Sequence, residues 1–290
     1  MIEQRDFKRR MLTALNYLII TFVALLCLYP MLHVLAASFS DPIRLIRHQG
    51  ALLWPVGYSL KGYQTVFRNP NILTGYMNTL IYVVGGTGLA ITLTLLGAYA
   101  LARTGWPMRK FFVFMFVFTM YFSAGMIPAF MLVKNTGLLH TRWAIILPTA
   151  VNTWNLIVMR TAFAAVPTEL QESAYIDGAS DLRILWQIYI PVSKATVAVI
   201  LLFYAVERWN SWFTAMIYLK DTSMYPLQIF VRDILLFNAA AGMTEDANAI
   251  YLKELTKYSL IIVAVVPILL EYPFVQRYFV KGVMLGSIKG

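Results

Sequence analysis

The sequence predicts an all-α integral membrane protein with about six transmembrane helices. Hydrophobic residues make up 59% of its 290 residues, charged residues make up only 13%, and the mean hydropathy is +0.65. A soluble domain typically carries about 25% charged residues. The apolar residues also gather into runs of about 20, the length of helix that crosses a bilayer. These observations exclude a water-soluble globular protein.

Six apolar stretches are the expected spans, and together they form a single membrane domain over 12–285. The first follows the basic flank Lys8–Arg10 and is too long for a cleaved signal peptide, so we expect a retained anchor. The second contains Gly85, Gly86 and Gly88, which are typical of close packing between membrane helices. The fourth is shorter and less apolar than the others. The six stretches cover residues 12–38, 79–102, 111–133, 143–159, 195–219 and 258–275.

The basic residues between these stretches predict the orientation of the chain. If the N-terminal segment 1–11 lies inside, the inner connections are richer in Lys and Arg than the longer outer loops, as the positive-inside rule requires. The net charge of +10 then reflects topology and not a nucleic-acid surface, because the basic residues flank apolar runs. We expect both termini, the tail 286–290 and the polar loop 167–191 to be cytoplasmic.

Few residues support an enzyme or a metal site. Cys27 is the only cysteine and lies in the first apolar stretch, so an intrachain disulfide is excluded. His33, His48 and His140 are scattered without the spacing of metal ligands. The sequence has no Gly-x-x-x-x-Gly-Lys-Ser/Thr loop, so we do not expect it to hydrolyse ATP itself. A membrane enzyme would also need a cluster of acid–base or nucleophilic groups, and none stands out.

The loop 167–191 has the local pattern of two short helices separated by a sharp turn. Pro167 and the acidic residues after it suit a first helical turn, and Asp177–Gly178 is a turn signal. Leucine and aromatic residues then recur at helical spacing as far as Pro191, which predicts a second, amphipathic helix on the membrane surface. On this pattern alone, an ordinary interfacial loop is the simpler interpretation.

The particular residues of this loop, however, resemble the cytoplasmic loop of permease subunits of binding-protein-dependent ABC importers. The family pattern is Glu-Ala-Ala, a short gap, Asp-Gly-Ala, and a proline further on. Serine in place of the second residue is the one departure, and it exchanges one small side chain for another. The end of the chain, 276–290, resembles the maltose-transporter-like carbohydrate branch of that family. In this sequence the loop pattern reads Glu172, Ser173, Ala174, Asp177, Gly178, Ala179 and Pro191.

The resemblance implies a type I importer fold and a channel-forming permease in the cytoplasmic membrane of a bacterium. Its partners would be a second homologous permease, a sugar-binding protein and two ATPase subunits that hold ATP and magnesium, while this chain would bind no cofactor. The cargo would be oligosaccharides, with fragments of plant or algal polysaccharides such as alginate as the specific expectation. The loop residues Glu172 to Ala179 would dock into an ATPase, and Gly286, Lys289 and Gly290 of the tail would reach toward the ATPases.

Charged residues inside the fifth stretch form a second candidate site. A charge within a spanning helix is costly unless it faces protein or water, so we expect Glu207 and Arg208 in the substrate path. Aromatic rings can stack on sugars, amides can bind hydroxyls, and arginine can pair with a uronate carboxylate. A structural Glu–Arg pair, with the tryptophans as packing or interface anchors, is the alternative. The expected lining comprises Glu207, Arg208, Trp209, Asn210, Trp212, Asn152 and Asn155.

Three further alternatives stay open. The outer loop 220–257 either meets the sugar-binding protein, as the resemblance implies, or is a solvated connector. The cargo of the importer could be a solute other than a sugar. An ion-coupled transporter with Glu207 and Arg208 as a relay is the third alternative, but it leaves the pattern in the loop 167–191 unexplained.

Overall fold

The structure is a computed structural model that describes residues 2–103, 105–240 and 255–270. These residues are mostly helical and contain no β-strand, only an isolated bridge between Ser40 and Tyr58. The predicted all-α membrane class is confirmed. The single membrane domain over 12–285 stays a prediction. The described residues divide into two compact units. The first unit takes its residues from 1–70 and 231–266, and the second takes the remainder.

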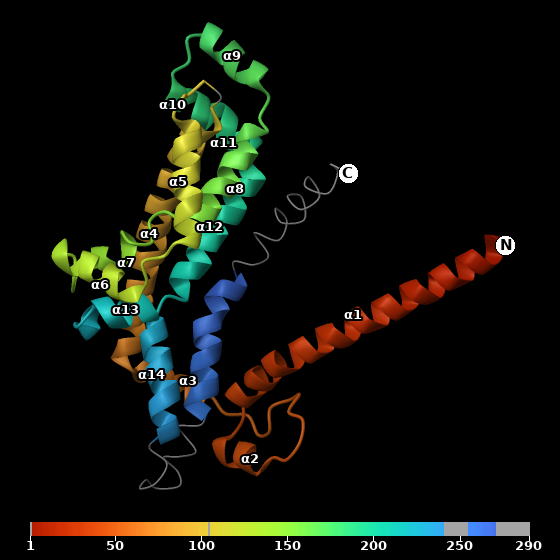
Figure 1. The fold of residues 1–290 in the computed structure, drawn as a ribbon. Coiled ribbons are helices and arrows are strands. Elements are labelled where there is room, and N and C mark those ends of the chain that lie inside the picture. The colour runs from red at the N-terminus through yellow and green to blue at the C-terminus, as the bar shows by residue number, and fades with distance from the viewer. Residues whose placement is uncertain (1, 104, 241–254, 271–290) are drawn as a thin grey trace. The chain divides into compact units, whose positions relative to one another are not determined.

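The first unit contains the long helix α1 (Ile2–Ser38), which is drawn in red in Figure 1. Its part Arg9–Ser38 is long and apolar enough to cross a membrane, as the sequence predicted. Side chains 9–32 are exposed, which suits a helix surrounded by lipid. Only its last turns are buried, where Ala36 and Ala37 pack with Leu52. This unit also contains α2 (Pro42–Arg47) and α3 (Lys61–Arg68), and most of α14 (Leu227–Ala240) and of the helix Leu255–Leu270.

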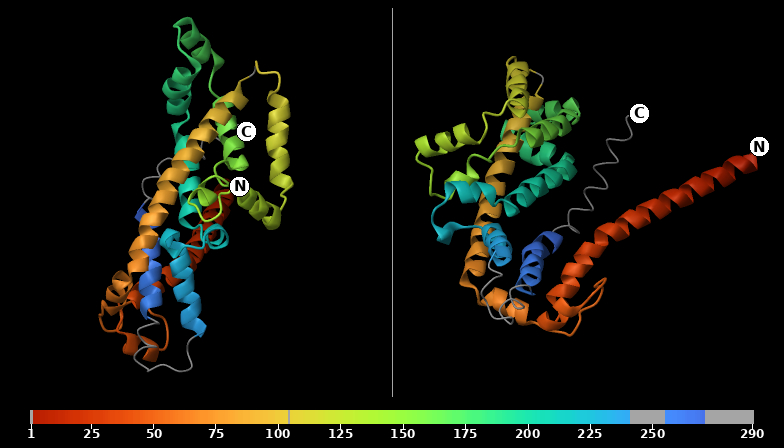
Figure 2. Two further views of the ribbon diagram at one scale, coloured as in Figure 1. Left: turned by 90° about the vertical axis from the view of Figure 1, so that its left-hand side faces the viewer. Right: turned by 60° about the horizontal axis from the view of Figure 1, so that its bottom comes forward.

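The second unit is built on α4 (Pro70–Ala102), which includes the predicted stretch 79–102 and begins earlier. Three helices lie along α4 in both Figure 1 and Figure 2. Their shared core contains Leu95, Leu156, Phe163, Ile200 and Tyr204, all of them buried. The three helices are α5 (Arg109–Tyr121), α8 (Thr153–Ala164) and α12 (Lys194–Trp209).

Three of the expected spans are interrupted, which corrects their description as single helices. In 111–133 the chain bends by 117° between α5 and the next helix, with Gly125 at a φ of +84°. In 143–159 a four-residue helix is followed by a break that contains Pro148. In 195–219, α12 ends at Trp209. Hydropathy averaged over a whole span does not locate such breaks, because it does not report backbone conformation. The short helices beside the breaks are α6 (Met126–Asn135), α7 (Trp143–Ile146) and α13 (Phe213–Tyr218).

The segment 220–257, which we expected to be an outer loop, contains helices in its described part. It contains the short helix η2 (Thr222–Met224) and then α14 (Leu227–Ala240). The backbone N–H of Leu227 donates to Thr79 Oγ1 at 2.9 Å, which fixes the start of α14 against α4. Residues 241–254 lie outside the described residues, as does 271–275 of the expected sixth span.

Candidate functional site

The helix α9 (Thr168–Ile176) begins directly after Pro167, as predicted, and ends in a glycine cap. The N–H of Gly178 donates to Tyr175 O at 3.0 Å, and the N–H of Ala179 donates to Ala174 O at 2.9 Å. This pair of hydrogen bonds is a Schellman motif, which needs a left-handed residue at the position of Gly178. The φ of Gly178 is +75°, so the predicted turn is confirmed.

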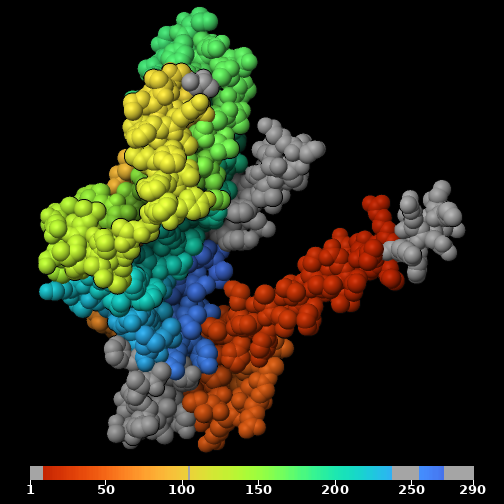
Figure 3. All heavy atoms as spheres, viewed as in Figure 1, coloured from red at the N-terminus to blue at the C-terminus, as the bar shows by residue number. Residues whose placement is uncertain are grey.

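The residues expected to dock on an ATPase differ in their exposure. Glu172, Ser173, Asp177 and Gly178 are exposed, and α9 is open to view at the upper end of Figure 3. Ala174 and Ala179 are half-buried and pack against the core of the second unit. The loop 167–191 also exposes large apolar side chains, namely Leu170, Tyr175, Ile176, Leu182 and Trp186, with Ile176 87% exposed. Apolar and charged groups exposed together suit a surface that meets another molecule.

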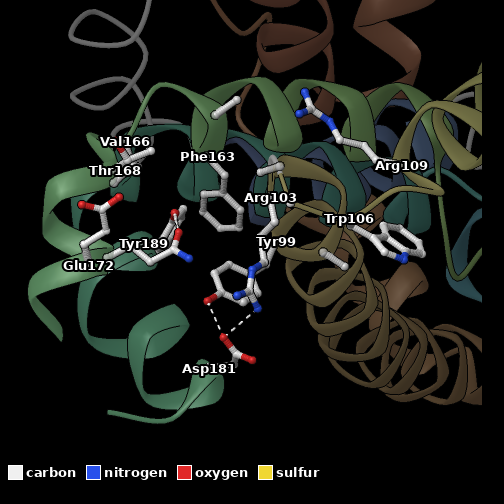
Figure 4. A pocket seen from close by; sticks show the side chains of 15 residues that line it. Tyr99, Arg103, Trp106, Arg109, Phe163, Val166, Thr168, Glu172, Asp181 and Tyr189 are labelled. Carbon is white, nitrogen blue, oxygen red and sulfur yellow. Dashed lines mark hydrogen bonds and ion pairs between the residues drawn. The ribbon is translucent and has the colours of Figure 1, made fainter. Parts of the chain in front are cut away.

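An arginine at the end of α4 holds this loop in place. Arg103 Nη1 lies 2.8 Å from Asp181 Oδ1, and Arg103 Nη2 donates to the Tyr175 hydroxyl at 2.6 Å. The Tyr175 hydroxyl in turn donates to Asp181, and the Tyr99 hydroxyl donates to the same carboxylate at 3.2 Å. Figure 4 shows Tyr99 and Arg103 both directed at Asp181. We call these four residues the Arg103 clamp, and they join α4 to both sides of the turn at Gly178.

The Arg103 clamp keeps its carboxylate ionised. The hydrogen bond from Tyr175, and then the Arg103 guanidinium, hold the pKa of Asp181 below its usual value, against the opposing effect of partial burial. The side chains of Arg103 and Asp181 are 36% and 54% exposed. Exposed ion pairs contribute only about 0–1 kcal/mol to stability. The clamp therefore orients the loop more than it stabilises the fold.

A second contact ties α9 to the core. The Tyr189 hydroxyl donates to Gln171 Oε1 at 2.5 Å. The Tyr189 ring packs edge-on against Tyr99 and Phe163, with centroids 5.0 Å and 5.4 Å away. Tyr189 ends a π-helical turn, a feature frequent at functional sites. The chain then bends by 90° before α12. The helical segments here are α10 (Asp181–Ile184), η1 (Leu185–Tyr189) and α11 (Ile190–Val192), so the second predicted helix continues through Pro191.

A cavity of about 890 Å³ lies between α9 and the ends of α4 and α8. Glu172 lines one side of it in Figure 4, and Trp106 and Arg109 line the other. Because the space beneath α9 is not filled by side chains, the polar contacts of Arg103 and Tyr189 carry much of the connection between α9 and the core.

The residues expected in the substrate path separate into two groups. Glu207, Arg208, Asn210 and Trp212 line a second, smaller cavity of about 190 Å³. The remaining three have structural positions. Trp209 is buried with its ring 6.0 Å from that of Tyr76. Asn152 caps α8 by accepting the N–H of Asn155 at 3.2 Å, and Asn155 itself is buried.

Arg208 is buried, with a relative exposure of 4%, and ties α12 to a neighbouring break. Its Nη2 donates to Thr149 O at 3.0 Å, in the segment between α7 and α8. The alternative of a Glu207–Arg208 ion pair is not what this structure contains, since the ion pairs found within the described residues are Arg103–Asp181 and Arg232–Asp233.

Some predicted contacts cannot be located in the structure, and some contacts in the structure were not predicted. Gly286, Lys289 and Gly290 lie outside the described residues. The clamp and Tyr189 were not predicted. One sequence signal could have indicated the clamp. Arg103 follows the end of one expected helix and Asp181 starts another, and both lie on the side expected to be cytoplasmic.

Comparison with known proteins gives consistent matches over nearly the whole chain. A family model described as "Binding-protein-dependent transport system inner membrane component" matches residues 90–284. The polygalacturonan/rhamnogalacturonan transport system permease protein YtcP of Bacillus subtilis is 40% identical over 98% of this chain and 100% of its own length. Protein LplC of the same organism is 36% identical over 97% of this chain and 96% of its own.

A solved structure is similar as well. It is the crystal structure of a bacterial ABC transporter involved in the import of the acidic polysaccharide alginate. The matching chain superposes with a TM-score of 0.86 and 33% sequence identity, over 93% of this chain and 97% of that one.

Proposed function

We propose that this chain, which belongs to the family of binding-protein-dependent transport system inner membrane components, is the channel-forming permease of an ATP-driven importer for fragments of acidic polysaccharides. It is a multi-pass membrane protein and a transporter subunit, not an enzyme. The proposed complex contains a second homologous permease, two ATPase subunits that hold ATP and magnesium, and an oligosaccharide-binding protein. Its proposed location is the cytoplasmic membrane of a bacterium.

The proposed cargo class is supported by the names of two relatives. One is named for polygalacturonan and rhamnogalacturonan transport, and the other is involved in the import of alginate, an acidic polysaccharide. Relatives named for lactose and galactooligosaccharides are only 25% and 28% identical to this chain. Oligosaccharides rich in uronate residues are therefore a better-supported cargo than neutral sugars, and alginate fragments are one member of this class.

The observation that carries the mechanism is the exposed and firmly capped helix α9. In the proposed mechanism α9 enters a cleft of one ATPase, where the exposed carboxylate of Glu172 pairs with a basic group. When ATP binding closes the ATPases, α9 moves with them. The Arg103 clamp passes this motion to α4, and the Gln171–Tyr189 hydrogen bond passes it to the core around Phe163.

The direct test is ATP hydrolysis by the complete complex in lipid with its binding protein. We expect galacturonate or alginate oligosaccharides to stimulate hydrolysis, and neutral oligosaccharides of the same length to stimulate it much less. Stimulation by a non-sugar solute alone would assign a different cargo. If no ATPase associates with the chain, the importer assignment itself is wrong.

A further inference from the structure

The small cavity on α12 is lined by a buried cation, Arg208, that forms no ion pair with any of the residues that the structure describes. We call it the Arg208 cavity, and its volume is about 190 Å³. Arg208 forms part of its wall, in the interior of the second unit and at the last turn of α12. The cavity is lined by Ile145, Thr149, Glu207, Arg208, Asn210, Ser211, Trp212, Phe213 and Thr214.

The hydrogen bonds of Arg208 do not use its full capacity. A guanidinium group has five N–H donors in a planar fork. In this structure Nη2 donates to Thr149 O at 3.0 Å and Nη1 donates to Tyr204 O at 3.4 Å. Both acceptors are neutral backbone oxygens. The Nε donor is buried without a hydrogen-bond partner. Nε lies against Gly86 of α4. Among the described residues Nη1 and Nη2 each make one of the hydrogen bonds above, so these two groups can donate to another acceptor.

The charge of Arg208 is also uncompensated by an ion pair. In the described part of the chain no carboxylate lies within ion-pair distance of it. Glu207 lines the same cavity, but its side chain is exposed, and its carboxylate is not among the ion pairs found in the described residues. A buried cation without a counter-ion is strongly unfavourable in the interior of a membrane protein. An anion that entered the cavity would remove this cost.

The position of Arg208 is fixed by its surroundings. Its guanidinium carbon lies 5.3 Å from the centroid of the Tyr204 ring. On the α4 side its stem passes Gly86, where an added Cβ would lie 2.8 Å from Arg208 Cδ. Gly86 is therefore needed to give the arginine room. Gly85 and Gly88 have open space at the same point, so of these three glycines only Gly86 is closely packed.

The remaining wall suits one sugar residue. Thr149, Asn210, Ser211 and Thr214 supply neutral polar groups, and the ring of Trp212 supplies an aromatic face. Hydroxyl and amide groups bind sugar hydroxyls, and aromatic faces stack on sugar rings. A volume of about 190 Å³ corresponds to roughly six water molecules. The cavity therefore admits one residue of an oligosaccharide and not the whole chain.

We infer that the Arg208 cavity receives the carboxylate of one uronate residue of the passing oligosaccharide, with Arg208 as its partner. This inference rests on the proposed importer function. Arginine binds carboxylates in a bidentate manner, and it does so most strongly away from water. Glu207 at the same cavity opposes the bound anion, which keeps the site weak enough for the cargo to leave. The permease then selects acidic over neutral cargo independently of the binding protein.

The test compares an acid with its neutral ester in the complete complex reconstituted in lipid vesicles. ATP-driven uptake is measured for the galacturonate trisaccharide and for its methyl ester. The same binding protein and ATPases are used throughout, so a changed ratio of the two rates is due to the permease. We expect Arg208→Gln to lower uptake of the acid by at least ~10-fold and uptake of the ester by less than ~2-fold. Lys134→Gln removes the same charge from an exposed side chain of α6 and should leave the ratio unchanged.

A second variant covers the case in which Arg208→Gln does not assemble. Glu207→Gln keeps the shape of an exposed side chain and removes the opposing charge. It should raise the acid-to-ester ratio by about 2–3-fold. Where the binding protein delivers only the acid, equilibrium dialysis of the two labelled trisaccharides against the complex without binding protein measures the same preference.

The outcomes separate the inference from the proposed function. If Arg208→Gln slows acid and ester equally, or Glu207→Gln leaves the ratio unchanged, Arg208 is a structural residue and the inference is wrong. If the wild-type complex neither transports nor binds either trisaccharide, the proposed function is wrong, and the inference is wrong with it.

Discussion

Arg103 and Arg208 lie at the ends of two neighbouring helices, and they differ in their burial and in their partners. Arg103, after the end of α4, is partly exposed, pairs with Asp181, donates to the Tyr175 hydroxyl and lies over the ring of Tyr99. Arg208, at the end of α12, is buried and bonded only to neutral backbone oxygens. The exposed arginine has a carboxylate partner, although an exposed ion pair contributes little to the stability of the fold. The buried arginine, which needs an anion far more, has none among the described residues.

This difference indicates two kinds of task. The charge of Arg103 is paired with a carboxylate within the chain, as expected of a fixed joint between α4 and the loop 167–191. The contacts of Arg208 are incomplete, as expected of a site that an external anion completes. Each prediction below changes one of the two sites and leaves the other unchanged.

The largest effect is expected from Gly178→Val. A β-branched residue at a φ of +75° is strained by about 1–2 kcal/mol or more, so the cap of α9 should be lost. Sugar-stimulated ATP hydrolysis should fall by at least ~10-fold while the chain still inserts into the membrane. Hydrolysis with and without the sugar is the measurement.

The matched control for this variant is Gly137→Val. Gly137 caps α6 with the same pattern of hydrogen bonds, at a φ of +72° and with open space around it. It should lower stability to a similar extent and leave the stimulation in place. Equal loss of stimulation in both variants would mean that strain alone, and not the position of α9, caused the effect.

The next effect is expected from Gly86→Ala, which should disturb Arg208 without touching the Arg103 clamp. The new methyl group would displace the Arg208 stem. The acid-to-ester uptake ratio should fall by about 3–10-fold, because a displaced guanidinium binds a carboxylate poorly. Gly85→Ala meets nothing within 4 Å and is the control. If the ratio in Gly86→Ala stays at the wild-type value, the position of Arg208 does not determine cargo selection, and the inference is contradicted.

A smaller effect is expected from Asp181→Asn, which removes the charge from the Arg103 clamp. Because exposed ion pairs contribute about 0.2–1 kcal/mol, the number of sugars transported per ATP should fall by at most ~5-fold. The thermal midpoint should change little. Asp221→Asn, which alters an exposed carboxylate that caps η2, serves as the control. A large drop in the thermal midpoint would instead make the clamp a structural element.

The smallest effect is expected from pH. The pKa of Asp181 is lowered from its ordinary value of 3.8, so the contribution of the clamp is present above that value and is lost as pH falls through the lowered pKa. The difference in coupling between wild type and Asp181→Asn should therefore be constant from pH 8 to about 5. A difference that disappears within this range would show that Asp181 is protonated at a higher pH than its contacts allow.

The sequence predicted α9 and its cap because their signals are local. Pro167 starts the helix and Gly178 ends it, whatever surrounds them. The sequence could not predict the Arg103 clamp, since Arg103 and Asp181 are 78 residues apart and meet only through tertiary packing. The same holds for Gly86 and Arg208. The broken spans were missed because each stretch as a whole is still apolar enough to be read as one span, and such an average does not report the backbone breaks at Gly125 and Pro148.

The central claim is tested most directly by uptake of labelled galacturonate trisaccharide into vesicles that contain the complete complex. We predict uptake when ATP is present on the ATPase side and no ion gradient exists, and none when ATP is replaced by a non-hydrolysable analogue. Uptake driven by an ion gradient without ATP would contradict the account and would make Glu207 and Arg208 candidates for an ion relay.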